Sequence, residues 1–269
     1  MRILFVADIY AKPGRRAAAD IIPRLLRERE VDFCVVNGEN AAGGFGLTEQ
    51  IAGKLHAYGA DVITSGNHIW NRADFVPYLE RTDRVLRPLN YPPAAAGRGS
   101  TVVTSRAGVP VGVVNLQGRT FMASIDCPFR RGHEEVERLR QETAVVLVDF
   151  HAEATAEKVA LGWHLDGLAS AVIGTHTHVQ TADERILPQG TAYLTDAGMT
   201  GAVESVIGTR PAIAVQRFLT QVPLRFKPAE GPALFCGALV DVDETTGRAT
   251  AIERLQLESG EGQPSGGGD

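Results

Sequence analysis

Short apolar runs that end abruptly in glycine or in polar side chains constrain the fold of this chain more than any other feature of its sequence. The clearest run is 171–173, which Gly174 closes. His176 and His178 follow it, two residues apart. Such a run is typical of a buried parallel strand that opens onto a loop, and open α/β sheets bind ligands at that edge. By itself, the histidine pair predicts a metal site or, with equal weight, a simple turn.

Four other apolar runs also end next to residues that can bind a metal ion or transfer a proton, and this repetition favours the metal site. The runs are the expected strands at 3–7, 33–36, 61–64 and 145–150, and the residues that follow them are Asp8, Glu39 with Asn40, Asn67 with His68, and His151. The pattern of strand, polar cluster and helix therefore recurs along the chain. Recurrent βα units predict an α/β fold with a mostly parallel sheet.

Other segments predict a second sheet and the helices between the strands. Residues 108–110 separate two β-rich runs and predict a hairpin, which indicates a second sheet. Pro23 interrupts the expected helix at 15–30 and either kinks or splits it. The helical spacing of 152–162 predicts that three polar side chains point outward: Glu153, Glu157 and Lys158.

Composition indicates one α/β domain in a reducing compartment. The chain has 269 residues, of which 44% are hydrophobic, enough for a core. We expect one domain over 1–257 and a disordered polar tail over 258–269. The apolar run at the start is too short for a signal peptide, and no stretch approaches the length of a membrane span. The three cysteines are widely spaced without a CxxC motif, so we expect a cytoplasmic protein.

The charge of the chain argues against an extended nucleic-acid surface. Lys and Arg total 27 against 32 Asp and Glu, a net charge of −5. We interpret Arg15-Arg16 and Arg130-Arg131 as solvated surface charge.

The glycine-rich stretch at 43–46 is not a Walker loop, and we interpret it as a flexible loop beside a site. We expect no membrane partner, and a homo-oligomer stays open.

The residues at the strand ends supply more ligands than one metal ion needs. They comprise two carboxylates, two amides and four imidazoles: Asp8, Glu39, Asn40, Asn67, His68, His151, His176 and His178. Mixed nitrogen and oxygen donors without a thiolate suit divalent Mn, Fe, Zn or Co rather than Ca. With about seven ligands and a bridging carboxylate, two ions roughly 3.5 to 4 Å apart are expected. The other histidines are interpreted as surface or capping residues: His56, His133 and His164.

These residues resemble the sequence blocks of the calcineurin-like metallophosphoesterase superfamily. Gly66-Asn67-His68 is similar to its G-N-H-[DE] block, and His151 to its lone histidine. The stretch 174–178 is similar to its G-H-x-H block with one inserted residue, while Asp8 matches its first aspartate. Tyr10 stands where that first block has a histidine, and a neutral phenol is a poor donor to a divalent ion.

Further departures from the superfamily pattern resemble its bacterial YmdB-like branch. The stretch 37–40, Asn-Gly-Glu-Asn, replaces the usual aspartate block, and Glu39 would then be the bridging carboxylate. The stretches 115–122, 148–153 and 195–201 are also similar to that branch, so the resemblance covers about residues 1–257. One departure touches the branch itself, because Tyr10-Ala11 stands where a smaller residue and glycine are common.

The resemblance implies a four-layer α/β/β/α metallophosphoesterase sandwich with two mixed sheets. It also implies a dinuclear phosphodiesterase whose partner is a small phosphodiester, a 2′,3′-cyclic nucleotide, which a metal-bridging hydroxide attacks. Fe or Mn are the expected ions, and Zn is a further alternative. Two shells of ligands are implied: Asp8, Glu39, Asn40 and His178 around one ion, and Glu39, Asn67, His151 and His176 around the other. His68 is left over and is the expected proton donor to the leaving oxygen.

Two other functions stay open at this point. A phosphomonoesterase or nucleotidase would use the same metal site and would hydrolyse monoesters faster than diesters. A metal-binding regulatory protein would instead act through RNA or protein partners, and its effect in cells would survive the loss of His68. The sequence fixes neither the native metal nor the physiological substrate.

Overall fold

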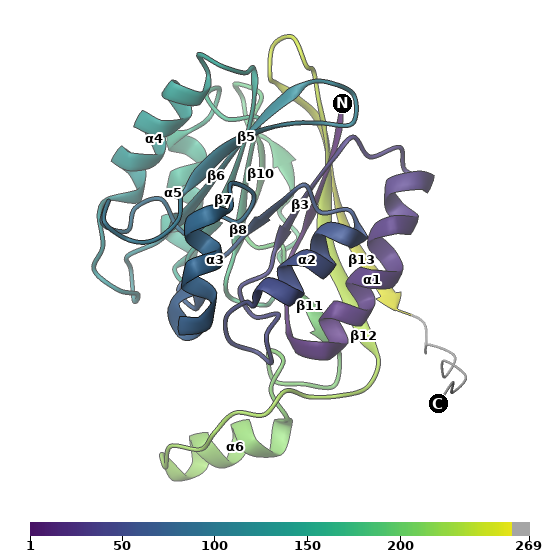
Figure 1. Cartoon of the computed structure of the whole chain (residues 1–269), viewed down its shortest axis with the longest axis vertical. Helices are drawn as coiled ribbons and strands as arrows, with labels where there is room; N and C mark the ends of the chain where they lie inside the picture. The colour runs from purple at the N-terminus through teal and green to yellow at the C-terminus, as the bar shows by residue number, and fades with distance from the viewer. Residues whose placement is uncertain (260–269) are drawn as a thin grey trace.

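Two β-sheets pack face to face and carry helices on their outer faces, so the chain forms the predicted four layers, α/β/β/α (Figure 1). The computed structural model describes residues 1–259. Both sheets contain parallel and antiparallel pairs, which confirms the expected α/β fold with two mixed sheets. The layers matter for function because they bring the ends of strands from both sheets to one place.

The first sheet places three parallel strands next to a long antiparallel hairpin. Its main path is β2-β11-β12-β1-β3-β4, and β13 pairs with β12 outside this path. β1, β3 and β4 are parallel, and β12 is antiparallel to both β1 and β13. The strand bounds are β1 (Arg2–Val6), β2 (Asp8–Ile9), β3 (Phe33–Asn37), β4 (Val62–Thr64), β11 (Met199–Ala202), β12 (Ala233–Val242) and β13 (Ala249–Ser259).

The second sheet has a parallel centre with an antiparallel strand at each edge. Its order is β5-β6-β7-β8-β10-β9, in which β6, β7, β8 and β10 are parallel. β5 and β6 form the hairpin predicted around residues 108–110. The strand bounds are β5 (Ser100–Thr104), β6 (Pro110–Gln117), β7 (Val145–His151), β8 (Ala171–Thr175), β9 (Arg185–Ile186) and β10 (Ala192–Leu194).

Successive side chains along the strands enter different cores, one between the sheets and one beneath the helices. In β1, Ile3 and Phe5 face the core between the sheets, whereas Leu4 and Val6 face the helices. Successive side chains of a strand point to opposite faces, so a strand covered on both sides needs an apolar residue at nearly every position. β7 alternates in the same way, with Val145 and Leu147 inward and Val146, Val148 and Phe150 outward.

Helices from both halves of the chain complete the outer layers. α1 and α2 pack on the first sheet, and α4 and α5 pack on the second (Figure 1). α6 lies in the segment between β11 and β12 and projects away from the sheets (Figure 1). The bounds are α1 (Ala11–Glu28), α2 (Glu49–Tyr58), α3 (Val76–Arg81), α4 (Pro128–Leu139), α5 (Thr155–His164) and α6 (Pro211–Thr220), with 3-10 turns at Ile69–Asn71 and Ala73–Phe75.

Two details differ from the sequence prediction. α1 runs through Pro23 without a break, so the proline does not split the helix. The missing amide hydrogen of Pro23 would have bonded to the carbonyl of Ala19, and Ala19 lies on a partly buried side of the helix. The second difference is at the end, where β13 continues to Ser259, so Glu258 and Ser259 are not part of a tail. The rest of the expected tail, 260–269, lies outside the described residues.

Among the helices of residues 1–259, none combines the length and the hydrophobicity that a membrane crossing requires.

Replacing Gly174 by alanine should destabilise the fold, because the new Cβ would lie 1.8 Å from the carbonyl oxygen of Thr195. Overpacking against backbone should lower the free energy of unfolding, measured in urea, by ~3 kcal/mol. Gly53→Ala in α2 is the matched control, since an added Cβ there meets nothing within 4 Å. Helix propensity predicts that this control gains about 0.5 to 1 kcal/mol. Equal effects of the two substitutions would contradict the packing argument.

Candidate metal centre

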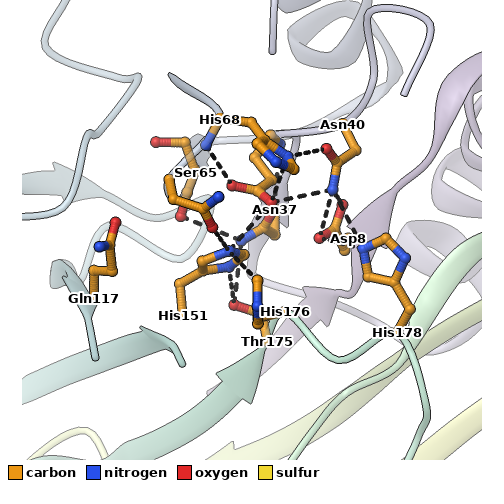
Figure 2. Close-up of polar contacts among 12 residues, drawn as sticks. Asp8, Asn37, Asn40, Ser65, His68, Gln117, His151, Thr175, His176 and His178 are labelled. Atoms are coloured by element: carbon orange, nitrogen blue, oxygen red, sulfur yellow. Dashed lines mark hydrogen bonds and ion pairs between the residues drawn. The ribbon is translucent and has the colours of Figure 1, made fainter. Parts of the chain in front are cut away.

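The eight residues singled out from the sequence meet in one buried cluster at the carboxyl ends of strands from both sheets. Figure 2 shows Asp8, Asn40 and His178 at one side of this cluster and His151 and His176 at the other. The Asp8, Glu39 and His151 side chains are fully buried. His68 is the most exposed of the four histidines, with 26% of its side chain accessible. The structure therefore brings together every predicted site residue.

Each residue of the cluster comes from the end of a strand or from the loop after it. Asp8 begins β2, His151 ends β7, and the Glu39-Asn40 and Asn67-His68 pairs follow β3 and β4. His176 and His178 follow β8, and their φ angles are 106° and 66°. Non-glycine residues in this left-handed region cost of order 1 to 3 kcal/mol each and are found mainly where a site requires them. This backbone turn allows both rings to reach back to the cluster.

One half of the cluster gathers around Glu39. Its Oε1 lies 3.1 Å from His151 Nε2, which in turn lies 3.0 Å from Asn67 Oδ1 and 3.0 Å from His176 Nδ1. The ligand atoms of Glu39, His151 and His176 all lie within 4.8 Å of one another. A carboxylate, an amide oxygen and two imidazole nitrogens at these distances form a group that can hold a metal ion.

The other half gathers around Asp8. Its Oδ2 lies 3.0 Å from His178 Nε2. The Asn40 amide nitrogen lies 2.9 and 3.0 Å from the two Asp8 oxygens, 3.1 Å from Glu39 Oε1 and 3.3 Å from His178 Nε2. Two amide hydrogens cannot serve four acceptors, so this half of the cluster has more acceptors than donors.

In three histidines, one ring nitrogen bonds to a residue outside the cluster, and this contact orients the other ring nitrogen toward the cluster. His178 Nδ1 donates to the carbonyl of Ile207 at 3.0 Å, and His176 Nε2 donates to Glu153 Oε2 at 3.0 Å. His151 Nδ1 lies 3.0 Å from the Thr175 hydroxyl, which donates to Asp149 Oδ1 at 2.8 Å and can therefore only accept from the ring. In the neutral form of each ring, this bonding places the lone pair on the nitrogen that faces the cluster: His151 Nε2, His176 Nδ1 and His178 Nε2.

These donors fit a divalent cation well. Lone pairs of imidazoles and carboxylates that face one another at about 3 Å repel unless a proton or a cation lies between them. Burial lowers the pKa of His178, but the Asp8 carboxylate outweighs this effect, so the pKa rises to about 9. Burial and the neighbouring His151 lower the pKa of His176 to about 3, so this ring is neutral. A cation would take the place of the proton and satisfy the same atoms.

Tyr10 packs beside this cluster and does not point into it. Its hydroxyl lies 3.4 Å from the Thr209 hydroxyl, and burial raises its pKa. Its ring meets the His178 ring edge to face, with the centroids 5.6 Å apart. Tyr10 therefore supports the position of His178. Ala11 has a φ of 51°, in the left-handed region that glycine adopts more readily than alanine.

Several supporting residues were not predicted from the sequence. Asp149 is fully buried in β7 and also accepts hydrogen bonds from Asn37 Nδ2 at 2.9 Å and from the Thr64 hydroxyl at 2.5 Å. Burial raises the pKa of Asp149 to about 6. A charged residue inside an otherwise apolar strand was the available signal, because such a residue is rarely buried without partners.

Lys158 is a second such residue, and the prediction that it points outward is wrong. It is 1% exposed, and its Nζ lies 2.5 Å from Asp196 Oδ2 and 2.8 Å from the carbonyl of Thr175. Asp196 also accepts hydrogen bonds from the backbone N–H and the hydroxyl of Thr177. This buried ion pair therefore holds the loop that carries His176 and His178.

Comparison with known proteins agrees with this geometry. The family model described as YmdB-like protein matches residues 4–255. The 2′,3′-cyclic-nucleotide 2′-phosphodiesterase of Bacillus subtilis (strain 168) is 46% identical over 257 residues, which cover 96% of this chain and 97% of that protein. A hypothetical protein from Thermus thermophilus has a solved structure that is 41% identical with a TM-score of 0.90, covering 96% of this chain and 99% of that one. The structure of a novel phosphatase from Mycoplasma pneumoniae is 31% identical with a TM-score of 0.90, covering 96% and 93%.

Replacing Asp149 by asparagine should weaken metal binding at the His151 side. An amide at position 149 can donate to the Thr175 hydroxyl, which would then donate to His151 Nδ1 and move the ring proton to Nε2. Loss of such support typically lowers metal affinity about 10- to 100-fold, which titration calorimetry with Mn²⁺ would measure. Asp166→Asn is the matched control, because Asp166 is another buried carboxylate and accepts backbone N–H groups of Gln189 and Thr191. The same loss of affinity in both variants would contradict this role.

Proposed function

Because the chain belongs to the YmdB-like protein family, we propose that it is a metal-dependent phosphodiesterase that hydrolyses 2′,3′-cyclic nucleotides. The resemblance inferred from the sequence blocks is confirmed at the level of the family. The observation that carries the proposal is the convergence of three inward-facing imidazole nitrogens on two buried carboxylates. The name of the Bacillus subtilis relative supports the choice of substrate.

Two divalent ions, with Fe or Mn first and Zn as an alternative, are proposed to occupy the two halves of the cluster. One shell would consist of Asp8, Glu39, Asn40 and His178, and the other of Glu39, Asn67, His151 and His176. Such a pair supplies a nucleophile at neutral pH and neutralises the charge that develops on the phosphoryl oxygens. The position of Glu39 between His151 and Asn40 supports its role as the shared carboxylate.

Asn40 fits this assignment after a half-turn of its carboxamide. Its nitrogen now faces Asp8, Glu39 and His178, while its oxygen lies 2.7 Å from His68 Nδ1. The half-turn exchanges these two atoms without moving any neighbour. The oxygen would then face the metal shell, and the nitrogen would face His68.

His68 is proposed to donate the proton to the leaving oxygen. As the acid, the ring is an imidazolium: its Nδ1–H lies 3.4 Å from Glu39 Oε1, and its Nε2 carries the proton for the leaving oxygen. The His68 backbone N–H donates to Glu39 Oε2 at 3.3 Å, which ties the ring to the proposed bridging residue. In the reaction, an oxygen from water bonds to phosphorus, the bond between phosphorus and the 2′ oxygen breaks, and the 2′ oxygen takes the proton from His68 Nε2. The product is a nucleoside 3′-phosphate.

We further propose that one chain forms a complete active site within one domain in the cytoplasm. All eight site residues come from a single chain, and the two sheets share the core between them. Cys34, Cys127 and Cys236 are free thiols, as a reducing compartment would maintain them.

A panel of phosphate esters tests the proposed activity. The protein loaded with Mn²⁺ should hydrolyse 2′,3′-cyclic AMP faster than 3′,5′-cyclic AMP and faster than p-nitrophenyl phosphate, a monoester. A chelator should abolish the activity, and added Mn²⁺ or Fe²⁺ should restore it. A higher rate on the monoester would favour a phosphomonoesterase or nucleotidase. Tight metal binding with no hydrolysis of any ester would favour a regulatory protein.

His68→Ala should lower turnover of 2′,3′-cyclic AMP by roughly 10²- to 10⁴-fold, as expected for the loss of a general acid. Elemental analysis should find the metal content nearly unchanged, because His68 lies outside both proposed shells. His56→Ala is a suitable control, since His56 lies in α2 and its Nδ1 bonds to the carbonyl of Ala60. Loss of a metal ion from His68→Ala would show that His68 is a ligand and that the assigned role is wrong.

A further inference from the structure

We propose that Phe45 is the surface on which the nucleobase of the substrate stacks, so that this ring selects nucleotides over cyclic phosphates that lack a base. The inference rests on the proposed function, because it concerns the leaving-group side of the same site. It adds a specificity residue to the proposed metal ligands and proton donor.

Phe45 lies next to the proposed proton donor and remains open to solvent. Its ring centroid is 5.0 Å from that of His68, and the two rings are nearly perpendicular at 70°. The residue is 36% exposed, and it belongs to none of the three hydrophobic core clusters of the described residues. Packing of the fold therefore does not explain an aromatic ring at this position, whereas a ligand that covers the ring would.

The loop that carries Phe45 is held against the site by close contacts and hydrogen bonds. The φ angles of Gly44 and Gly46 are 97° and 76°. A Cβ on Gly44 would lie 2.7 Å from the Tyr10 hydroxyl oxygen, so glycine is required for the loop to approach Tyr10 this closely. The Gly44 N–H donates to the carbonyl of Asn40 at 3.0 Å, and the Ala42 N–H donates to the carbonyl of Gly46 at 2.9 Å. This loop lies beside the site, as predicted, but these contacts hold it in place, which does not fit the predicted flexibility. The loop therefore fixes Phe45 relative to His68.

The chemistry of the substrate places its base on this side of the site. The proton from His68 goes to the 2′ oxygen, which is bonded to C2′ of the ribose. C2′ is bonded to C1′, and C1′ carries the base. The base is therefore attached to the carbon next to the one that carries the oxygen that His68 protonates. Among the cluster residues, His68 is the one whose ring Phe45 contacts edge to face, so an aromatic surface is present where the base emerges.

Stacking on such a ring is tolerant of sequence, because every base has a π-face, and it typically strengthens binding by about 10-fold or more. We therefore expect Phe45 to act mainly on KM. We also expect a larger effect with purines than with pyrimidines, since a purine presents more surface to the ring.

Phe121 is the rival surface. It is 89% exposed, with a φ of 61°, on the loop after β6. Three residues earlier, the N–H of Gly118 donates to the carbonyl of His151 at 3.0 Å. The Phe121 loop is thus tied to the end of the strand that carries His151. A substrate whose base leaves on the His68 side should not depend on it.

The test compares kcat/KM for 2′,3′-cyclic AMP with kcat/KM for glycerol 1,2-cyclic phosphate, which has the same type of ester but no base. In Phe45→Ala the ratio of the two values should fall about 10-fold, mainly through the KM for the nucleotide. Phe45→Trp should restore the ratio, and Phe121→Ala should leave it at the wild-type value.

Three results would overturn the inference while the proposed function stands. The first is an unchanged ratio in Phe45→Ala. The second is an equal loss of kcat/KM on both substrates in Phe45→Ala, which would mean that Phe45 only supports the His68 ring. The third is a ratio that falls in Phe121→Ala alone. If the wild-type protein hydrolyses neither cyclic ester, the proposed function fails, and this inference fails with it.

Discussion

The burial of the Asp8 and Glu39 carboxylates is the constraint on which the rest of the site depends. Both residues are fully buried, and removing an ion from water without compensation costs several kcal/mol. The groups that can carry a compensating positive charge are imidazoles: His178 lies 3.0 Å from Asp8 and His151 lies 3.1 Å from Glu39. Burial raises the pKa of Glu39, but His151 outweighs this effect and holds the pKa well below its usual value. Two cations at the same places would compensate both carboxylates while the imidazoles stay neutral.

The supporting residues orient the histidine rings that compensate these buried carboxylates. Asp149 through Thr175, Glu153, and the carbonyl of Ile207 each bind the rear nitrogen of one histidine. The Lys158–Asp196 ion pair then holds the loop whose strained backbone presents two of these rings. These contacts join residues of the second sheet, of α5 and of the segment between β11 and β12, and together they fix the orientation of a few nitrogen atoms.

The positions of the site residues could be predicted from the sequence, but the residues that hold them in place could not. Strand ends can be located from local apolar runs, and parallel strands bring their ends together, so all eight side chains could be predicted to meet. Lys158 could not be predicted correctly, because helical spacing places a lone lysine outward and its partner, Asp196, lies 38 residues away. The four-layer arrangement came from resemblance to a family and not from periodicity. The orientation of the Asn40 amide depends on neighbours from several loops and has no signal in the sequence.

The number of metal ions per chain tests the central claim most directly. Protein purified in its active form, without chelator, can be analysed for Mn, Fe and Zn while its activity on 2′,3′-cyclic AMP is measured on the same sample. We expect about two ions per chain at full activity, because Asp8 and Glu39 each need a cation and each lies beside a different imidazole. Full activity with a single ion per chain would contradict it.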